Sequence, residues 1–391
     1  MPELANKSEC SGCMACIDAC PKSAISSQLD TDGHIYPKID SSKCINCGLC
    51  EKTCAISSKL NYTESENAIA YAAWAKNKDA RKQSASGGAF LAMAEYILSN
   101  GGIVFGAAMD GVADVNHICI DNIKDIFKLQ GSKYAHSNAA GIYKQVFSYL
   151  KDGKLVLFSG TGCQVAGLYG FLSNKKYGGR LVTVDLICGG VPSRLLIDKF
   201  LENVSYEVKR IVSFRTKENG WSPKGFAYNL KIEDTSGVIH DYTNQKTLIS
   251  TGFACEMTNR YSCYQCQFAG TNRMSDFTIG DYWGIEDYKE EHYNGISAII
   301  AHNNQAISLL KEMSKTLSIQ KTDISNILAN NKRLGKVNDK RYLMPERKYL
   351  VWMFNHLSYK TICRIYALDF SRRSPWMIYK VYRLIMNKIL K

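Results

Sequence analysis

The sequence lacks any run of apolar residues long enough to cross a membrane. A membrane-spanning helix needs about 20 consecutive, predominantly apolar residues, and no such stretch occurs in the 391 residues. The opening residues MPELANKSEC also lack the charged segment and apolar run of a secretory signal. We therefore expect a cytoplasmic protein whose thiols stay reduced.

The sequence also has little that would suit nucleic-acid binding. Its 49 basic residues exceed its 36 acidic residues, which gives a net charge of +13. Residues 339–391 alone contain 12 basic and 3 acidic residues, so +9 of this excess lies in the last segment. The remainder shows no basic face with aromatic platforms and no reader motif. No nucleic-acid partner is expected, and the basic segment is a separate feature.

Cysteine, in contrast, is abundant, with 15 residues. In a chain of this size, tight local clusters of cysteine favour metal ligation over a disulfide framework. Zinc motifs contain close pairs of cysteines that are separated by a long gap. Here, in contrast, two runs of four cysteines share the spacing C-x2-C-x2-C-x3-C. The runs are Cys10, Cys13, Cys16 and Cys20, and Cys44, Cys47, Cys50 and Cys54. This spacing is typical of a two-cluster bacterial ferredoxin.

In such a ferredoxin, three thiolates of one loop bind one 4Fe-4S cluster and the fourth cysteine reaches the other cluster. We therefore assign two ligand sets. The first cluster is expected to bind Cys10, Cys13, Cys16 and Cys54. The second cluster is expected to bind Cys20, Cys44, Cys47 and Cys50.

Beyond a polar linker at residues 57–67, short apolar runs alternate with helical periodicity. This alternation predicts an α/β core. The expected strands are 68–75, 102–109, 154–160, 180–188, 276–281 and 297–302, with several antiparallel strands within 208–241. The expected helices begin after Gly88, near residue 140, from Gln164 and from Pro192.

Four further cysteines have unusual surroundings. Cys163 lies just beyond one predicted strand and Cys188 stands at the end of another, each beside a glycine-rich turn, and Cys263 and Cys266 form a C-x2-C pair. Strand ends can converge at one edge of an α/β sheet, where ligands bind. The alternative is that these cysteines are small buried apolar residues, which is the interpretation we favour for Cys119 and Cys363.

The glycine-rich turns give a weaker indication of a nucleotide-type cofactor. After the strand at 154–160, Val165 stands where a dinucleotide fingerprint needs its third glycine. Backbone N–H groups at a helix start still suit a pyrophosphate. Ser86, Gly87 and Gly88 open a predicted helix, and Lys133 could supply a countercharge. The alternative is ordinary turn chemistry.

Several motifs in order carry a family resemblance over roughly residues 1–305. They are 83–88 (QSASGG), 131–134 (GSKY), 160–164 (GTGCQ), 185–193 (DLICGGVPS), 220–221 (GW), 262–266 (SCYQC) and 275–284 (SDFTIGDYWG). With the ferredoxin segment, the chain resembles bacterial members of the coenzyme F-420 hydrogenase/dehydrogenase beta subunit family. It is also similar to 7-hydroxymethyl chlorophyll a reductase.

The resemblance implies FAD and a third 4Fe-4S cluster beside it. By the same resemblance, Cys163, Cys188, Cys263 and Cys266 would hold that cluster, with Cys255 in reserve. The FAD contacts would be Ser86, Gly87, Gly88, Lys133, Tyr134, Gly160, Thr161 and Gln164. Two positions depart from the family pattern: Gly162 replaces a frequent Pro, and Gly189 replaces a frequent His. The missing His implies a lost proton donor or a different substrate.

The resulting expectation is an α+β chain in four parts. Residues 1–60 form a dicluster ferredoxin domain, 68–200 and 201–330 the two parts of an α/β flavin and iron-sulfur region, and 331–391 a basic helical tail. Such a tail could lie on an anionic membrane surface at the periphery of the inner membrane, dock an acidic donor, or pack on the protein body.

The expected function is an oxidoreductase that passes electrons between 4Fe-4S clusters and FAD. Its partners would be a donor such as ferredoxin or reduced deazaflavin and an organic substrate that the sequence does not name. The sequence also identifies no catalytic residue. The alternatives are a non-catalytic electron-transfer subunit and a binding module of a surface-polysaccharide pathway.

Overall fold

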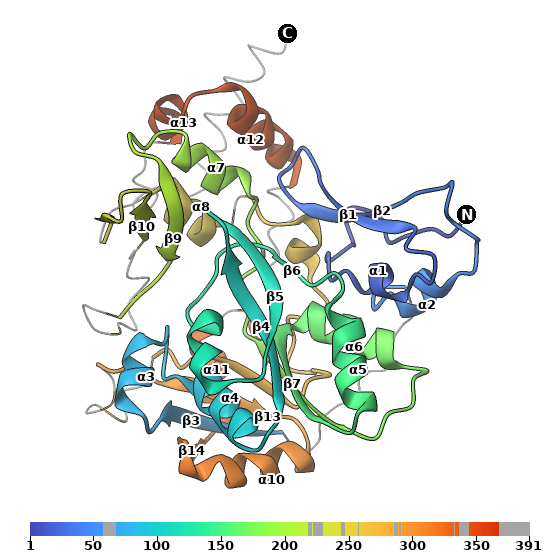
Figure 1. Cartoon of the computed structure of the whole chain (residues 1–391). Helices are drawn as coiled ribbons and strands as arrows, with labels where there is room; N and C mark the ends of the chain where they lie inside the picture. Colours follow the sequence, from blue (N-terminus) through green and yellow to red (C-terminus); the bar gives the residue numbers. More distant parts are fainter. Residues whose placement is uncertain are drawn as a thin grey trace.

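The computed structural model describes residues 1–57, 68–217, 221, 230–243, 247–256, 258–284, 288, 291, 293–331, 333–335 and 344–366. The first 57 residues fold into a small domain at one side of the molecule (Figure 1). It contains two short helices and an antiparallel hairpin: α1 (Ala15–Ala19), β1 (Ile25–Leu29), β2 (Ile35–Ile39) and α2 (Leu49–Thr53). We call it the dicluster domain.

The two cysteine runs of the dicluster domain have the same local structure. Cys20 directly follows helix α1 and Cys54 directly follows helix α2, so the fourth cysteine of each run is a helix C-cap. The N-caps, Met14 and Gly48, follow the second cysteine of each run and have φ of 68° and 70°. The repeated cysteine spacing is therefore matched by a repeated backbone conformation.

The body of the protein is built on one nine-stranded mixed sheet, in the order β14-β3-β13-β12-β8-β7-β4-β5-β6. Its strands are β3 (Ile69–Ala75), β4 (Ile103–Asp110), β5 (Asp114–Ile120), β6 (Ser137–Asn138), β7 (Leu155–Thr161), β8 (Arg180–Leu186), β12 (Phe277–Asp281), β13 (Ser297–Ala301) and β14 (Leu317–Thr322). Strands β7, β8 and β12 are parallel neighbours, so their carboxyl ends lie at one edge.

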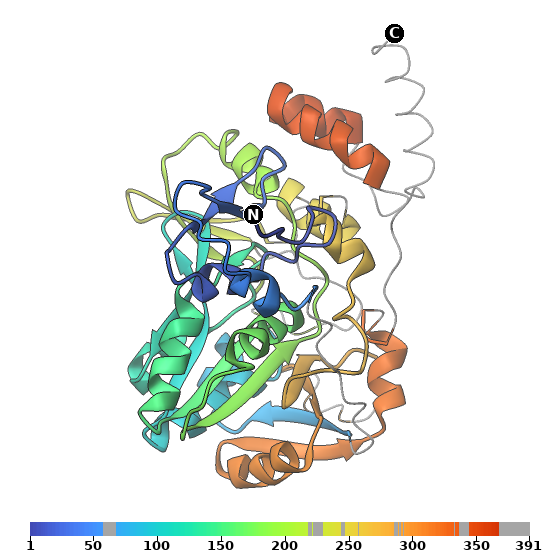
Figure 2. The ribbon, with the colours of Figure 1, turned by 90° about the vertical axis from the view of Figure 1, so that its right-hand side faces the viewer.

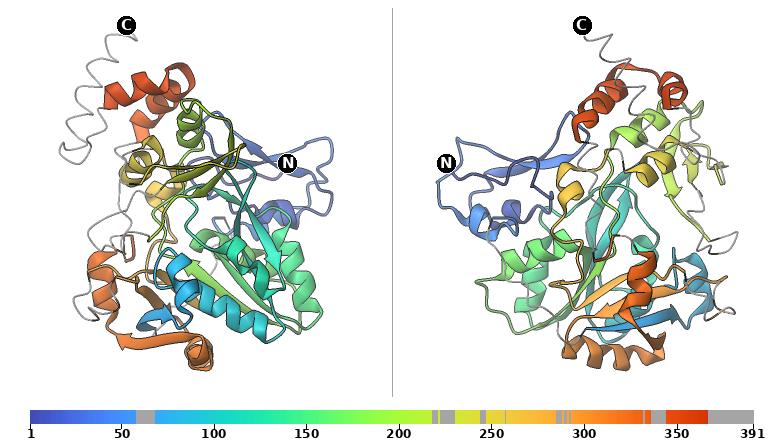
Figure 3. Two further views of the ribbon diagram at one scale, coloured as in Figure 1. Left: turned by 60° about the vertical axis from the view of Figure 1, so that its left-hand side comes forward. Right: turned by 180° about the vertical axis from the view of Figure 1, so that it is seen from behind.

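Helices cover both faces of this sheet, as Figures 1 and 3 show. On one face, α4 (Ala89–Ser99) and α10 (Asn304–Glu312) bury Met93 and Leu310 against the strands. On the other face, α5 (Ile142–Lys151) and α6 (Gly162–Leu172) bury Val146 and Leu168. The sheet is therefore buried on both faces, which explains the apolar runs of its strands.

The remaining described elements lie around the sheet. They are the short helices α3 (Lys78–Gln83), α7 (Leu195–Leu201), α8 (Leu248–Cys255), α11 (Ile324–Asn330), α12 (Met344–His356) and α13 (Tyr359–Tyr366), the 3-10 segments η1 (Ile123–Leu129), η2 (Tyr261–Gln265) and η3 (Met313–Lys315), and a three-stranded sheet of β9 (Val208–Ser213), β10 (Lys231–Asp234) and β11 (Ile239–Asp241). None of the helices in these ranges combines the length and apolarity needed to pass through a bilayer.

Helix α1 of the dicluster domain packs against α5 and α6 of the body. The buried Asp18 carboxylate accepts backbone N–H groups from Gly141 at 2.6 Å, Tyr143 at 2.8 Å and Lys144 at 3.2 Å. These donors belong to the start of α5, where the helix dipole favours a negative charge. The Tyr143 hydroxyl donates to the carbonyl of Cys13 at 2.7 Å. One helix cap therefore joins the domain to the body.

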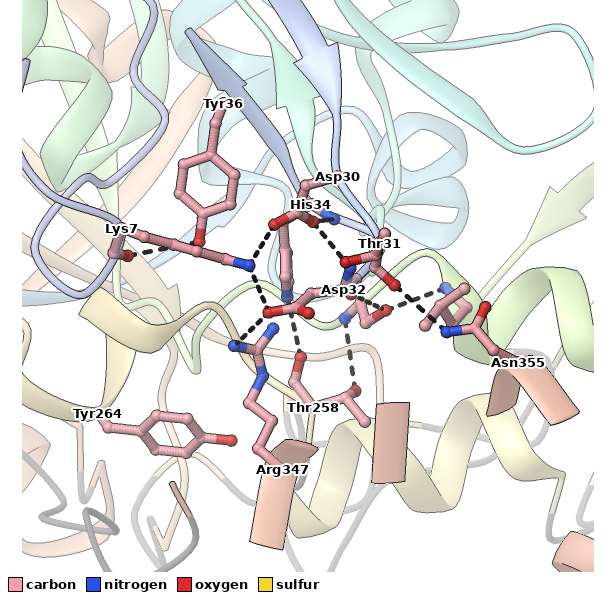
Figure 4. A network of polar contacts seen from close by, with 12 residues as sticks. Lys7, Asp30, Thr31, Asp32, His34, Tyr36, Thr258, Tyr264, Arg347 and Asn355 are labelled. Atoms are coloured by element: carbon pink, nitrogen blue, oxygen red, sulfur yellow. Dashed lines mark hydrogen bonds and ion pairs between the residues drawn. The ribbon is translucent and has the colours of Figure 1, made fainter. Parts of the chain in front are cut away.

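Helix α12 lies against the turn between β1 and β2, as Figures 2 and 4 show. The fully buried Arg347 is 3.3 Å from the Asp32 carboxylate and lies over the Tyr261 ring, 3.9 Å from its centroid. Asn355 donates to the carbonyl of Thr31 at 3.4 Å. The part of the basic tail in α12 and α13 thus packs on the protein. Residues 367–391 lie outside the described ranges, and membrane contact stays a prediction.

Candidate redox site

The turn that carries Cys163 joins β7 to α6. Thr161, the N-cap, donates its N–H to Oε1 of Gln164 at 3.0 Å, and its Oγ1 lies 3.0 Å from the Cys163 Sγ. Gln164 Nε2 donates to the carbonyl of Ser137 at 2.9 Å. The side chain of Gln164 therefore shapes the turn that presents the thiol.

The other three cysteines of this group reach the same place from β8 and η2. Cys188 follows β8, and its Sγ accepts the N–H of Gly190 at 3.3 Å. All four thiols, of Cys163, Cys188, Cys263 and Cys266, line one cavity of about 220 Å³. Cys255, the reserve candidate, ends α8, and its side chain lies outside the described residues.

Burial makes these thiols difficult to ionise. Burial and then the charge of Cys188 raise the pKa of Cys263 to about 12, and burial with the charge of Cys163 also raises the pKa of Cys266. Thiols must lose their protons to bind a metal, and the metal charge offsets this cost. The four-cysteine cavity therefore suits a cationic iron-sulfur core.

The dicluster domain brings together the predicted ligands of the first cluster. Burial, followed by the charges of Cys10, Cys163 and Cys54, raises the pKa of Cys13 to about 12. Burial, with the charges of Cys10 and Cys54 among its neighbours, also raises the pKa of Cys16. The thiols of Cys10, Cys13, Cys16 and Cys54 are therefore near one another, and the assignment of ligands across the two runs stays a prediction. Cys13 also lies against Gly167 of α6, the helix that carries Cys163.

The second group lies toward the surface. Cys20 packs with Cys50 in one small apolar cluster, while Cys44 is half-buried and Cys47 is exposed. In the described ranges, no three His, Cys, Asp or Glu side chains are arranged to hold a single metal ion.

A larger cavity of about 600 Å³ opens beside the four-cysteine cavity. Cys163 and Cys188 line both cavities. The predicted FAD residues that line the large cavity are Ser86, Gly88, Lys133, Tyr134, Gly160, Thr161 and Gln164. Gly87 instead packs between strands: a Cβ there would lie 2.5 Å from both the Ala73 oxygen and the Ser297 nitrogen.

The large cavity combines aromatic walls with buried charges. Tyr134 stacks on Phe253 with ring centroids 4.0 Å apart, and Trp283 contributes a second aromatic surface. Lys133 donates to the carbonyl of Gln130 at 2.7 Å, and burial lowers the pKa of this lysine to about 7. The volume and the apolar walls with a few polar groups are typical of a cofactor site.

Family comparisons identify the body of the protein. A model for the C-terminal part of the coenzyme F420 hydrogenase/dehydrogenase beta subunit matches residues 153–327, and its N-terminal counterpart matches residues 70–144. The chain belongs to the coenzyme F420 hydrogenase/dehydrogenase beta subunit family. A 4Fe-4S dicluster domain model matches residues 9–57. This F420 beta subunit family member therefore carries its own iron-sulfur domain.

The similarity of the chain to individual proteins is weak. No curated protein matches the chain. Among solved structures, a chain from the xenon-derivatized F420-reducing [NiFe] hydrogenase complex from Methanosarcina barkeri is 15% identical. The match covers 72% of this chain and 92% of that chain, with a TM-score of 0.47.

The structure gives a physical reason for one departure from the family pattern. A Cβ at Gly162 would lie 2.8 Å from Nη1 of Arg273, whose guanidinium pairs with the buried Asp185 at 3.0 Å. A Cβ at residue 162, which Pro also carries, would therefore meet the Arg273 guanidinium. Gly189 is different: a Cβ there would be 3.6 Å from the Phe253 ring, an ordinary contact.

Sequence reasoning missed the buried arginines around the four-cysteine cavity. Arg273 lines that cavity, and Arg260 lies fully buried between the dicluster domain and the body. Burial raises the pKa of Cys10 and of Cys163, and the charge of Arg260 opposes the rise in both. A single arginine without a motif gives no signal in one sequence.

Proposed function

We propose that this protein is an iron-sulfur flavoprotein that passes electrons between three 4Fe-4S clusters and FAD, and so reduces or oxidises an organic substrate or a deazaflavin-type coenzyme. The observation that carries this proposal is the shared wall of the two cavities. Cys163 and Cys188 border both the four-cysteine cavity and the large cavity. A cluster and a flavin in these cavities would be direct neighbours.

The three cysteine groups form a path from the surface to the large cavity. Cys47 of the second group is exposed, Cys13 of the first group faces α6, and Cys163 at the start of α6 belongs to the third group. An external donor would therefore meet the second cluster first. The flavin would supply the exchange between one-electron and two-electron chemistry, which clusters alone do not provide.

The chain's own residues fit FAD at the large cavity. Gly88, with φ of 84°, is the N-cap of α4, and the N–H groups at this helix start suit an anion. Lys133 stands on the cavity wall as the countercharge to a pyrophosphate. Tyr134 and Phe253 present a stacked pair on which a planar ring can rest.

Anaerobic purification tests the proposal by composition. We expect bound flavin and about twelve irons per chain, as three 4Fe-4S clusters require. The variants C188S and C266S should fall to about eight irons. The matched control C363S removes a cysteine of α13 outside the three groups and should keep the wild-type content. Iron without flavin, or full iron in C188S, would contradict the proposal.

Turnover separates an enzyme from a subunit that only transfers electrons. The isolated chain is reduced with ferredoxin, a reduced deazaflavin or a reduced nicotinamide, and flavin absorbance is followed. Flavin reduction by one donor, with reoxidation by an added organic acceptor, supports a catalytic role. Cluster reduction that never reaches the flavin supports the electron-transfer alternative.

A further inference from the structure

Arg260 is a buried cation at the junction of the dicluster domain and the body. Its side chain is 0% exposed. The residue precedes η2, and its carbonyl accepts the N–H of Cys263, a predicted ligand of the third cluster, at 2.9 Å. Its backbone therefore belongs to the loop that carries two of the third cluster's cysteines.

The guanidinium of Arg260 reaches from this loop into the dicluster domain. A Cβ at Gly12 would lie 2.7 Å from the Arg260 Cζ, so the guanidinium rests against the loop between Cys10 and Cys13. It also lies over the Tyr36 ring, 4.4 Å from its centroid. One charge therefore stands beside the first cluster's loop while anchored in the third cluster's loop.

The hydrogen bonds of Arg260 leave two of its three guanidinium nitrogens without an acceptor. Its Nη2 donates to the carbonyl of Ile35 and to Nδ1 of His136, both at 2.9 Å. Nε and Nη1 are buried and have no hydrogen-bond partner in the described part of the chain. No acidic side chain in those ranges forms an ion pair with Arg260.

A buried charge without a counterion is strongly unfavourable. Both neighbouring cysteine groups would become anionic when they bind iron-sulfur clusters through four thiolates. Reduction by one electron makes a cluster still more negative, so a nearby cation favours the reduced state. Net charge and hydrogen bonds to sulfur are among the factors that set cluster potentials.

We propose that Arg260 is the counterion shared by the first and third clusters and that it raises the reduction potentials of both relative to the second cluster. Its free Nε–H and Nη1–H groups are the donors available to cluster sulfur. Arg260 is thus a positioning and tuning residue on the path to the large cavity. This inference rests on the proposed function, because it needs clusters at both cysteine groups.

The test is a redox titration of anaerobically purified protein, followed by EPR of the clusters. R260Q should lower two of the three midpoint potentials, with a change of at least about tenfold in the reduction equilibrium constant, which equals ~59 mV for one electron. R260K keeps the charge but loses the forked donors, so its potentials should lie between those of R260Q and the wild type.

The matched control is R210Q, since Arg210 is an exposed residue of β9 that pairs with Glu233. Its three potentials should equal those of the wild type. Fully loaded R260Q with unchanged potentials would overturn the proposal. If R260Q fails to retain its clusters, the charge-neutral variant R260M is titrated in its place, and wild-type potentials in loaded R260M would overturn the proposal equally.

Iron content separates the proposed function from the role of Arg260. About eight irons in the wild type would show that the third cluster is absent and would contradict that part of the proposed function. The effect of R260Q on the first cluster would still be measurable in that protein. About twelve irons with potentials that do not respond to Arg260 would instead leave the proposed function intact and reject the tuning role.

Discussion

Gly167 on α6 lies directly against the thiol of Cys13 in the dicluster domain. A Cβ at residue 167 would be 2.9 Å from the Cys13 Sγ and 3.1 Å from its Cβ. Cys163 stands one helical turn earlier on the same helix. The absence of one side chain therefore allows the first and third cysteine groups to approach each other.

The variant G167A tests this contact. Alanine normally stabilises a helix relative to glycine by about 1 kcal/mol, but here it should collide with Cys13 and destabilise by about 1–3 kcal/mol. We expect a lower Tm and a loss of about four irons. The control G178A adds a Cβ where no atom lies within 4 Å. A G167A protein with wild-type iron and Tm would show that the contact is unimportant.

The contact between Arg347 and Asp32 predicts that removing either partner destabilises the protein to a different extent. Asp32 also pairs with Lys7 at 2.8 Å, so it keeps a partner in R347M. In D32N, Arg347 stays fully buried without its counterion. Because an uncompensated buried charge costs ~3 kcal/mol or more, D32N should destabilise the protein more than R347M does. Urea unfolding measures both; the reverse order would contradict the arrangement.

The elements of the body follow from the sequence better than their assembly does. The predicted strands 68–75 and 102–109 correspond to β3 and β4, and the helix after Gly88 is α4. Each has strong periodicity of its own. In contrast, the sequence patterns do not predict β5 and β14. Strand β14 (LSIQKT) is a polar strand at the edge of the sheet with only one fully buried side chain, so it lacks an apolar run.

In the candidate redox site, too, local features can be predicted from the sequence and long-range contacts cannot. Cysteine spacing is local and predicts the ligand groups of the dicluster domain, and the Cys163 and Cys188 turns follow strands that periodicity reveals. The contacts that join the domain to the body are long-range. His34 Nε2, for example, lies 3.1 Å from the carbonyl of Thr258, 224 residues away (Figure 4). No pattern in one sequence indicates such pairs.

The pKa of Lys133 predicts how FAD affinity depends on pH. Burial lowers this pKa from 10.5 to about 7 in the protein without cofactor. A pyrophosphate favours the charged amine, so FAD affinity should fall as the pH rises above about 7. K133M should weaken FAD binding by ~10-fold or more and flatten this dependence. Flavin fluorescence titration of apoprotein from pH 6 to 9 measures both effects.

The same group affects the stability of the apoprotein with the opposite sign. Between about pH 7 and 10.5, the unfolded chain keeps the Lys133 proton while the folded chain has released it. The free energy of unfolding should therefore rise with pH through this window. K133M should lose that contribution to the slope. An identical slope in the wild type and K133M would show that Lys133 titrates normally.

The contacts of Gly162 predict the effect of proline, the residue that the family resemblance implies at this position. In G162P, the ring should displace Arg273 from Asp185 and leave a buried carboxylate without its charge partner. We expect a lower Tm and loss of the third cluster, seen as about four fewer irons. G162A should change both quantities in the same direction with a smaller effect. Wild-type iron and Tm in G162P would contradict the explanation.

The most direct test of the proposed electron path is to add electrons to the anaerobic protein in steps while recording cluster EPR and flavin absorbance on one sample. We expect about twelve irons and bound flavin, with electrons that enter the clusters also appearing on the flavin. Protein that is colourless, that binds zinc in place of iron, or whose clusters are reduced without any flavin signal would contradict it.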